Sequence, residues 1–185
     1  HIQKIHNKTY TTTTKKLLYI PTSISSYKTY APYRNLYDAF YVDWQKTLLD
    51  TLKKNNIDYR VKTHPKSTLS YSHLDKNEIE NKTLEKCFDT YDGFIFDYVS
   101  TALTESLATH KKIVYFDIGS RKISPKALQC LKTDTLYKEI VFDHSLEDQI
   151  LAVLSLEKQR QFNFINTFSL GGKATAEVFN EIINK

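Results

Sequence analysis

The stretch Gly93-Phe-Ile-Phe-Asp97-Tyr-Val-Ser-Thr101 decides the fold class, because a short apolar run passes directly into a helical segment. Phe94 to Phe96 carry no polar side chain, which is typical of a strand buried on both faces. Residues 100–109 then have the pattern of a helix. A buried strand followed at once by a helix is the repeating unit of a parallel α/β sheet.

The same alternation runs along the whole chain. Further strands are predicted at residues 16–20, 59–64, 112–117 and 139–142. Helices are predicted at residues 39–54, 77–88, 125–131, 146–159 and 173–183, with Asn55 and Asn56 as the stop of the first and Ser145 as a cap. The chain is therefore expected to have an α/β fold, a Rossmann-like parallel sheet with helices on both faces.

The length of 185 residues suits one domain of ordinary size. We assign residues 16–185 to a single Rossmann-like nucleotide-binding domain and residues 1–15 to a linker or the edge of a fragment. The sequence contains no Met, and it begins inside a polar stretch. This predicts a fragment of a longer protein.

The composition limits which kinds of ligand, partner and cellular compartment fit this chain. The net charge of +5 favours anionic ligands, but the lysines are scattered rather than gathered in a basic stripe, so no nucleic acid is expected. Two cysteines, Cys87 and Cys130, are too few for a disulfide framework or a four-ligand zinc site, which predicts reduced thiols in the cytoplasm. No stretch reaches the roughly 18 apolar residues of a spanning helix, so any membrane contact is expected to be peripheral, at the inner face.

Ligands of parallel sheets bind outside the carboxyl ends of the strands, where the strand order reverses. His64 leaves one predicted strand at this edge, and Pro65 is expected to fix the exit of the chain so that the imidazole can donate to a phosphate oxygen. A single histidine is more often a structural or surface residue, so His64 alone does not identify a site.

A second candidate follows the strand at 93–97. Ser100 and Thr101 would place two hydroxyls and free backbone N–H groups at the start of a helix, which suits an anion. Glu105, one turn further, could accept hydrogen bonds from ribose hydroxyls. The competing interpretations are an ordinary helix cap and a glutamate that pairs with the helix dipole. The sequence has no P-loop, no Gly-x-Gly-x-x-Gly and no Gly-x-Ser-x-Gly, which excludes these phosphate loops and the serine-hydrolase elbow.

The order of these motifs resembles a known family. Tyr19-Ile-Pro-Thr22, then His64-Pro65, then Asp97-Tyr-x-Ser-Thr-x-x-x-Glu105, then the strand at 112–117, is similar to the C-terminal half of CDP-glycerol glycerophosphotransferases. Those enzymes make teichoic acids and related capsule polymers with a GT-B fold of two facing Rossmann-like domains. The same motifs also resemble bacterial sialyltransferases and capsule Kdo transferases that use CMP-sugars. Residues 171–175 look like the start of the family's final helix.

The resemblance implies a transferase that moves a sugar or polyol phosphate from a CMP- or CDP-activated donor to a polysaccharide-like or teichoic-acid-like acceptor. It implies phosphate contacts from His64, Ser100, Thr101 and Thr22, and a ribose contact from Glu105. The N-terminal GT-B half, expected to supply the acceptor site and the catalytic base, is absent from this chain. Catalytic residues therefore stay unassigned, and the isolated chain is expected to be inactive. Residues 23–26 also depart from the aromatic and Arg that the teichoic acid enzymes usually show there.

Two other functions stay open. One is a non-catalytic sensing or interaction domain that binds a partner through the tyrosine-rich loop at 25–41. The other is half of a UDP-sugar transferase or epimerase. No cofactor is expected beyond the nucleotide of the donor, and no metal, since Asp97 and Asp117 are expected to orient loops or cap helices.

Overall fold

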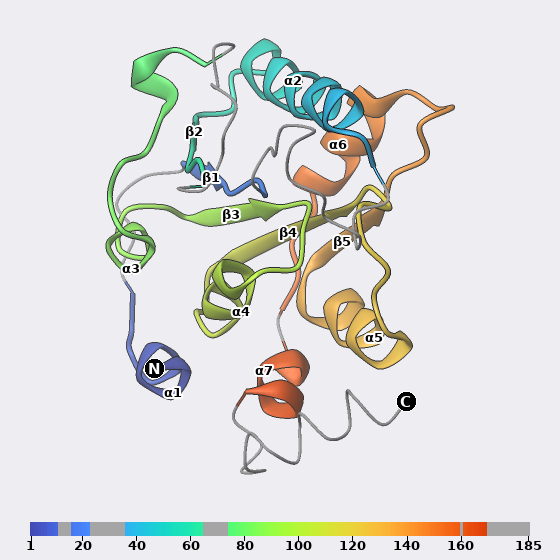
Figure 1. Ribbon diagram of the computed structural model, residues 1–185. Coiled ribbons are helices and arrows are strands. Elements are labelled where there is room, and N and C mark those ends of the chain that lie inside the picture. Colours follow the sequence, from blue (N-terminus) through green and yellow to red (C-terminus); the bar gives the residue numbers. More distant parts are fainter. Residues whose placement is uncertain (11–15, 23–35, 65–73, 160, 170–185) are drawn as a thin grey trace.

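The computed structural model describes residues 1–10, 16–22, 36–64, 74–159 and 161–169 (Figure 1). It contains a five-stranded, all-parallel sheet in the order β2-β1-β3-β4-β5. The strands are β1 (Leu17–Tyr19), β2 (Tyr59–Val61), β3 (Gly93–Phe96), β4 (Lys112–Asp117) and β5 (Leu136–Glu139). The predicted α/β fold with a parallel sheet is confirmed.

Side chains of the central strands alternate between two hydrophobic cores. In β3, Phe94 and Phe96 enter one core and Ile95 enters the other. All four residues of β3 are buried, as a strand covered on both faces requires. Because both faces of the central strands are buried, their sequences are unbroken runs of apolar residues.

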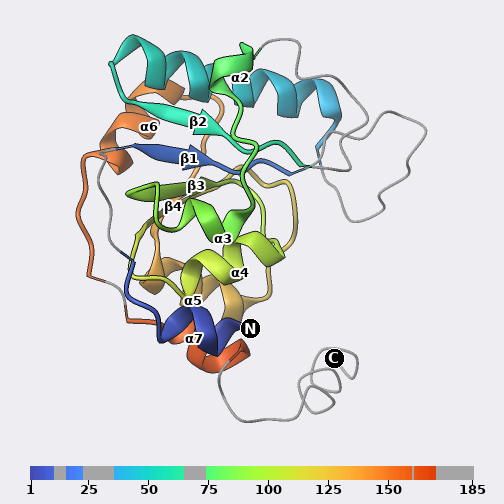
Figure 2. The ribbon, with the colours of Figure 1, turned by 90° about the vertical axis from the view of Figure 1, so that its left-hand side faces the viewer.

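Helices cover each face of the sheet (Figures 1 and 2). One core is closed by α2 (Asp38–Lys54) and α6 (Leu146–Leu154). The other is closed by α1 (Ile2–His6), α3 (Leu84–Cys87), α4 (Thr101–Leu107), α5 (Pro125–Asp134) and α7 (Asn163–Phe168). The layers are therefore helix, sheet and helix.

Gly93 begins β3 where the backbone is crowded on both sides. A Cβ at this position would lie 3.0 Å from Leu17 Cδ2 and 3.0 Å from the Lys112 carbonyl oxygen. Because the second neighbour is backbone, it cannot move aside without disturbing β4. Glycine here allows β1, β3 and β4 to start side by side.

The helix predicted at residues 77–88 is wrong for its first part and forms only at its end. Only a short 3₁₀ helix, η1 (Lys76–Glu78), and the later α3 form in this region. Between them Ile79 forms a parallel bridge with Val61, and the Glu80 N–H donates to the Val61 carbonyl at 2.9 Å. The segment extends the edge of the sheet beside β2, and this long-range pairing overrides its helical pattern.

Other boundaries also differ from the prediction, most clearly those of β5 and α6. The strand predicted at 139–142 instead begins at Leu136, because β5 pairs with β4 from Val114↔Leu136 to Asp117↔Glu139. The helix predicted at 146–159 ends at Leu154, although its cap is as expected, with Ser145 Oγ accepting from the Asp148 N–H at 3.3 Å. The end of α2 is also confirmed, since Lys54 is its last residue and Asn56 adopts a left-handed φ of 54°.

The sequence did not predict two short helices, α1 and α7. Helix α1 lies within the stretch assigned as linker, yet Ile5 is only 3% exposed in the core, and His6 Nδ1 lies 3.2 Å from the Ala108 carbonyl oxygen at the end of α4. Part of residues 1–15 therefore packs on the domain. The helix predicted at 173–183, the motif at 171–175 and most of the tyrosine-rich loop lie outside the described residues.

Candidate functional site

The strand order reverses between β1 and β3. From β1 the chain moves outward to β2, then crosses back to place β3 on the other side of β1 (Figure 2). A cavity of about 360 Å³ lies at the carboxyl ends of these three strands. This is the position at which open parallel sheets bind their ligands.

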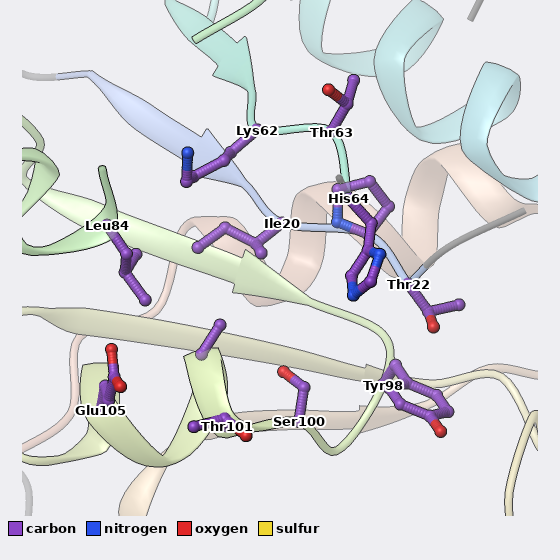
Figure 3. A pocket seen from close by; sticks show the side chains of 12 residues that line it. Ile20, Thr22, Lys62, Thr63, His64, Leu84, Tyr98, Ser100, Thr101 and Glu105 are labelled. Atoms are coloured by element: carbon purple, nitrogen blue, oxygen red, sulfur yellow. The ribbon is translucent and has the colours of Figure 1, made fainter. Parts of the chain in front are cut away.

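The cavity is built from the three segments that leave these strands, with one residue of α3 (Figure 3). Its lining is Ile20, Pro21 and Thr22 after β1, Lys62, Thr63 and His64 after β2, Tyr98, Ser100, Thr101, Ala102 and Glu105 after β3, and Leu84. All five residues proposed from the sequence, Thr22, His64, Ser100, Thr101 and Glu105, therefore line one cavity. The strands that carry His64 and Ser100 are not neighbours, however, because β1 lies between them.

His64 is exposed and extends from the end of β2. The Lys62 N–H donates to the Tyr19 carbonyl at 2.8 Å, so pairing with β1 continues just beyond β2 and fixes the direction of this segment. In Figure 3 the imidazole and the Ser100 hydroxyl reach toward the same space from opposite sides. Pro65, expected to orient the ring, lies outside the described residues.

Ser100 is the N-cap of α4, as the ordinary interpretation of this motif predicts. Its Oγ accepts from the Leu103 N–H at 3.2 Å. A hydroxyl that accepts one hydrogen bond still has its own proton to donate, so capping and anion binding are compatible. Since α4 has only seven residues, we attribute any anion affinity to the hydroxyls of Ser100 and Thr101 rather than to the helix dipole.

Glu105 lies one turn along α4 with a side chain that is 20% exposed. Burial raises the pKa of its carboxyl, and the negative charge of Glu85 adds to this rise. His1 Nε2 lies 3.4 Å from Oε1. A half-buried carboxylate of this kind is well suited to accept hydrogen bonds from ligand hydroxyls.

The backbone N–H of Thr22 is fixed by a hydrogen bond to α2. Its N–H donates to the Tyr41 hydroxyl at 2.9 Å, and Tyr41 in turn donates to Asp97 Oδ1 at 2.8 Å. Asp97 has no exposed surface and also accepts from the Tyr19 hydroxyl and, at 3.0 Å, from Trp44 Nε1. A buried carboxylate thus ties β1, α2 and β3 together behind the cavity.

Sequence reasoning placed Asp97 at a strand end but missed this network. Asp97 was expected to orient a loop or cap a helix, whereas it binds three aromatic side chains that lie 53 to 78 residues away in the sequence. Burial raises the pKa of its carboxyl to about 6, although hydrogen bonds from Tyr19, Tyr41 and Trp44 oppose this rise. No local pattern connects residues so distant in the chain.

Asp117 behaves as expected. Its Oδ1 accepts from the Gly119 N–H at 3.1 Å in the loop after β4, and its Oδ2 accepts from the Tyr137 hydroxyl at 2.7 Å. This same loop carries Arg121, whose guanidinium donates to the Tyr98 hydroxyl at 3.1 Å and lies 5.5 Å from the centre of that ring. The sequence did not single out Tyr98, although its ring lines the cavity.

Within the described parts of the chain there is no group of three or more His, Cys, Asp or Glu side chains that could hold a metal ion. Cys87 and Cys130 are both buried free thiols. Among the described helices, none has the length and apolar composition needed to cross a bilayer.

The chain was compared with known protein families, curated proteins and solved structures. No protein-family model, curated protein or solved structure matches this chain.

Proposed function

We propose that this domain binds the cytidine nucleotide of an activated donor, in a transferase that moves a sugar or polyol phosphate to a polysaccharide-like or teichoic-acid-like acceptor. The observation that carries the proposal is the convergence of Thr22, His64, Ser100, Thr101 and Glu105 on one cavity at the strand-order reversal. These residues come from three separate segments of the chain. Each segment follows a different strand, and the strand order β2-β1-β3 brings the three strand ends to one cavity.

The chemistry of the lining suits a nucleotide phosphate and its ribose. The imidazole of His64 and the hydroxyls of Ser100 and Thr101 are hydrogen-bond donors, and hydrogen bonds to a charged phosphate oxygen are stronger than those between neutral groups. The carboxylate of Glu105 supplies an acceptor for ribose hydroxyls. Apolar residues such as Ile20 and Leu84 complete the wall. Most small-molecule sites combine an apolar lining with a few placed polar groups in this way.

In the proposed reaction CMP is the leaving group. Negative charge develops on its phosphate as the bond to the transferred group breaks, and donors already in place around that phosphate stabilise this charge. The residues named here therefore bind the donor and stabilise its departure. The acceptor site and the catalytic base belong to the second half of the GT-B fold in this proposal.

Calorimetry tests the proposal directly. Titrating the domain with CMP, CDP and UDP should show binding of the cytidine nucleotides and weaker binding of UDP. His64→Ala should weaken CMP binding about tenfold to a hundredfold, the range for a hydrogen bond to a charged group. His144→Ala is the matched control, because His144 is exposed in the turn before α6 and lies outside the cavity.

Each other result has a clear meaning. Preference for UDP would favour a UDP-sugar enzyme. Absence of nucleotide binding, both in the folded domain and in a chain extended by the reading frame upstream of His1, would overturn the proposal and leave the sensing or interaction domain. Equal losses in His64→Ala and His144→Ala would remove His64 from the site.

A further inference from the structure

A network of hydrogen bonds around the buried carboxylate of Asp97 lies behind the cavity. Asp97 directly follows β3, has no exposed surface and accepts hydrogen bonds from Tyr19 in β1 and from Tyr41 and Trp44 in α2. Its backbone carbonyl also accepts from the Ser120 hydroxyl at 3.3 Å. One residue therefore connects both strands of the reversal with the helix on one face and the loop after β4.

The Tyr41 hydroxyl forms one hydrogen bond to Asp97 and one to Thr22 at the cavity. Its proton goes to Asp97 Oδ1, while its oxygen accepts the Thr22 N–H. Thr22 lines the cavity immediately after β1. Two consecutive hydrogen bonds thus join a buried carboxylate to the backbone of a residue at the proposed ligand site.

We propose that Asp97 is a positioning residue for this site, which holds Thr22 through Tyr41 while ionised and loosens it on taking up a proton. The hold on Thr22 follows from the hydrogen-bond network alone. Its consequence for ligand affinity rests on the function proposed above.

The hydrogen-bond geometry determines where the added proton goes. Oδ2 already accepts two hydrogen bonds, from Tyr19 and Trp44, and an indole N–H can only donate. Oδ1 accepts from the Tyr41 side chain. A proton taken from solvent therefore binds Oδ1, which changes from acceptor to donor toward the Tyr41 oxygen.

This reversal changes the surroundings of Tyr41. Its oxygen would receive a proton from Asp97, so its own proton must turn away from Asp97 and toward the space used by the Thr22 N–H. The neighbouring Gln45 Nε2, buried and without a hydrogen-bond partner among the described residues, is an amide donor and cannot accept that proton, so the turned hydroxyl repels the Thr22 N–H. The bond from Thr22 is therefore the one that weakens.

Asp97 is the one member of this hydrogen-bond network whose side chain changes its charge near pH 6. Burial raises its pKa to about 6. The groups around it are Tyr19 from β1, Tyr41 from α2 and Tyr115 from β4, which also feels the charge of Asp117. Burial raises the pKa of each of these tyrosines well above its ordinary value, so all three stay neutral near pH 6.

NMR of the Thr22 amide tests the positioning without any ligand. Its chemical shift should change with a midpoint near pH 6 in the wild-type protein and stay flat in Asp97→Asn and in Tyr41→Phe. Asp92→Asn is the matched control, because Asp92 is exposed at the opposite end of β3 and should leave the titration unchanged. Repeating the series in His64→Ala removes the contribution of the imidazole in the same cavity.

A Thr22 titration that persists in Asp97→Asn and Tyr41→Phe, or that is missing from the wild type, would overturn the inference. If circular dichroism shows that Asp97→Asn does not fold, Tyr41→Phe decides, because it removes the shared hydroxyl and keeps the carboxylate.

Calorimetry with CMP tests the consequence for affinity. Lowering the pH from about 7.5 to about 5.5 should weaken binding about threefold to tenfold more in the wild type than in Tyr41→Phe, which is the effect of losing one ordinary hydrogen bond. The comparison between proteins cancels the protonation of the CMP phosphate itself, which has a pKa of about 6. Equal pH effects in the two proteins would refute the link to affinity. Absence of CMP binding at both pH values would instead contradict the proposed function, while the Thr22 titration would still decide the positioning.

Discussion

His64 and Ser100 line the same cavity although the strands that carry them are separated by β1. The arrangement follows from the crossing of the chain over β1 between β2 and β3. Residues from either side of the reversal can then act on one ligand, with Thr22 between them at the end of β1. Substitutions at separate positions should therefore affect separate parts of the ligand.

Thr101→Val should weaken CMP binding about threefold to tenfold, because it removes one hydroxyl donor and keeps the shape of the side chain. Thr101 is exposed in the first turn of α4, so the thermal unfolding midpoint should change little. Thr83→Val is the control, since Thr83 is an exposed threonine before α3 and is not part of the lining. Unchanged affinity in Thr101→Val would remove this hydroxyl from the phosphate site.

Glu105→Gln should reduce discrimination between CMP and 2′-deoxy-CMP. The wild-type carboxylate is expected to bind the ribose form more tightly, because a charged acceptor forms a stronger hydrogen bond with the 2′-hydroxyl than an amide does. Calorimetry with both ligands measures the ratio of affinities. Glu139→Gln, at the exposed end of β5, should leave the ratio unchanged. If wild type and Glu105→Gln discriminate equally, Glu105 does not contact that hydroxyl.

Asp97 should make the protein less stable as the pH rises from about 4 to about 6. Its pKa in the folded protein is about 6, above the ordinary value of 3.8, so the folded state holds more protons than the unfolded state in this window. The free energy of unfolding therefore falls with increasing pH, by no more than about 3 kcal/mol at about 1.4 kcal/mol per pKa unit. Below this window both states are protonated, and above it both are ionised.

Urea unfolding at several pH values measures this effect, followed by circular dichroism and by the fluorescence of Trp44, the single tryptophan. Asp97→Asn removes the ionisation and should remove this contribution, so the wild type minus Asp97→Asn difference isolates it from the other carboxyls. A difference that stays constant across this pH window would show that Asp97 does not titrate in that range.

Gly93→Ala should destabilise the fold by about 1 to 3 kcal/mol, because the new methyl group would press against the Lys112 carbonyl and the Leu17 side chain. Gly119→Ala is a useful comparison. A Cβ at Gly119 would meet none of the described residues within 4 Å, but the backbone φ of 69° there is left-handed. Its substitution therefore introduces backbone strain of about 1 kcal/mol without a clash. A smaller loss in Gly93→Ala than in Gly119→Ala, measured by urea unfolding, would mean that the start of β3 can widen.

The local sequence determined which elements form wherever one segment carries its own pattern. The apolar runs around Leu18, Ile95 and Val114 are buried strands because each must fill two cores at once, and α2 shows its apolar face at helical spacing. Motif order also selected five side chains that line one cavity. These features depend on residues near one another in the chain.

Tertiary structure decided what depends on distant partners. Pairing of Ile79 with Val61 replaced a predicted helix, and pairing with β4 moved β5 to begin at Leu136. The strand order placed β1 between β2 and β3, and packing of α2 on the sheet brought Tyr41 and Trp44 to Asp97. Hydrogen bonds and burial between segments far apart in the chain set these outcomes, and no local periodicity encodes them.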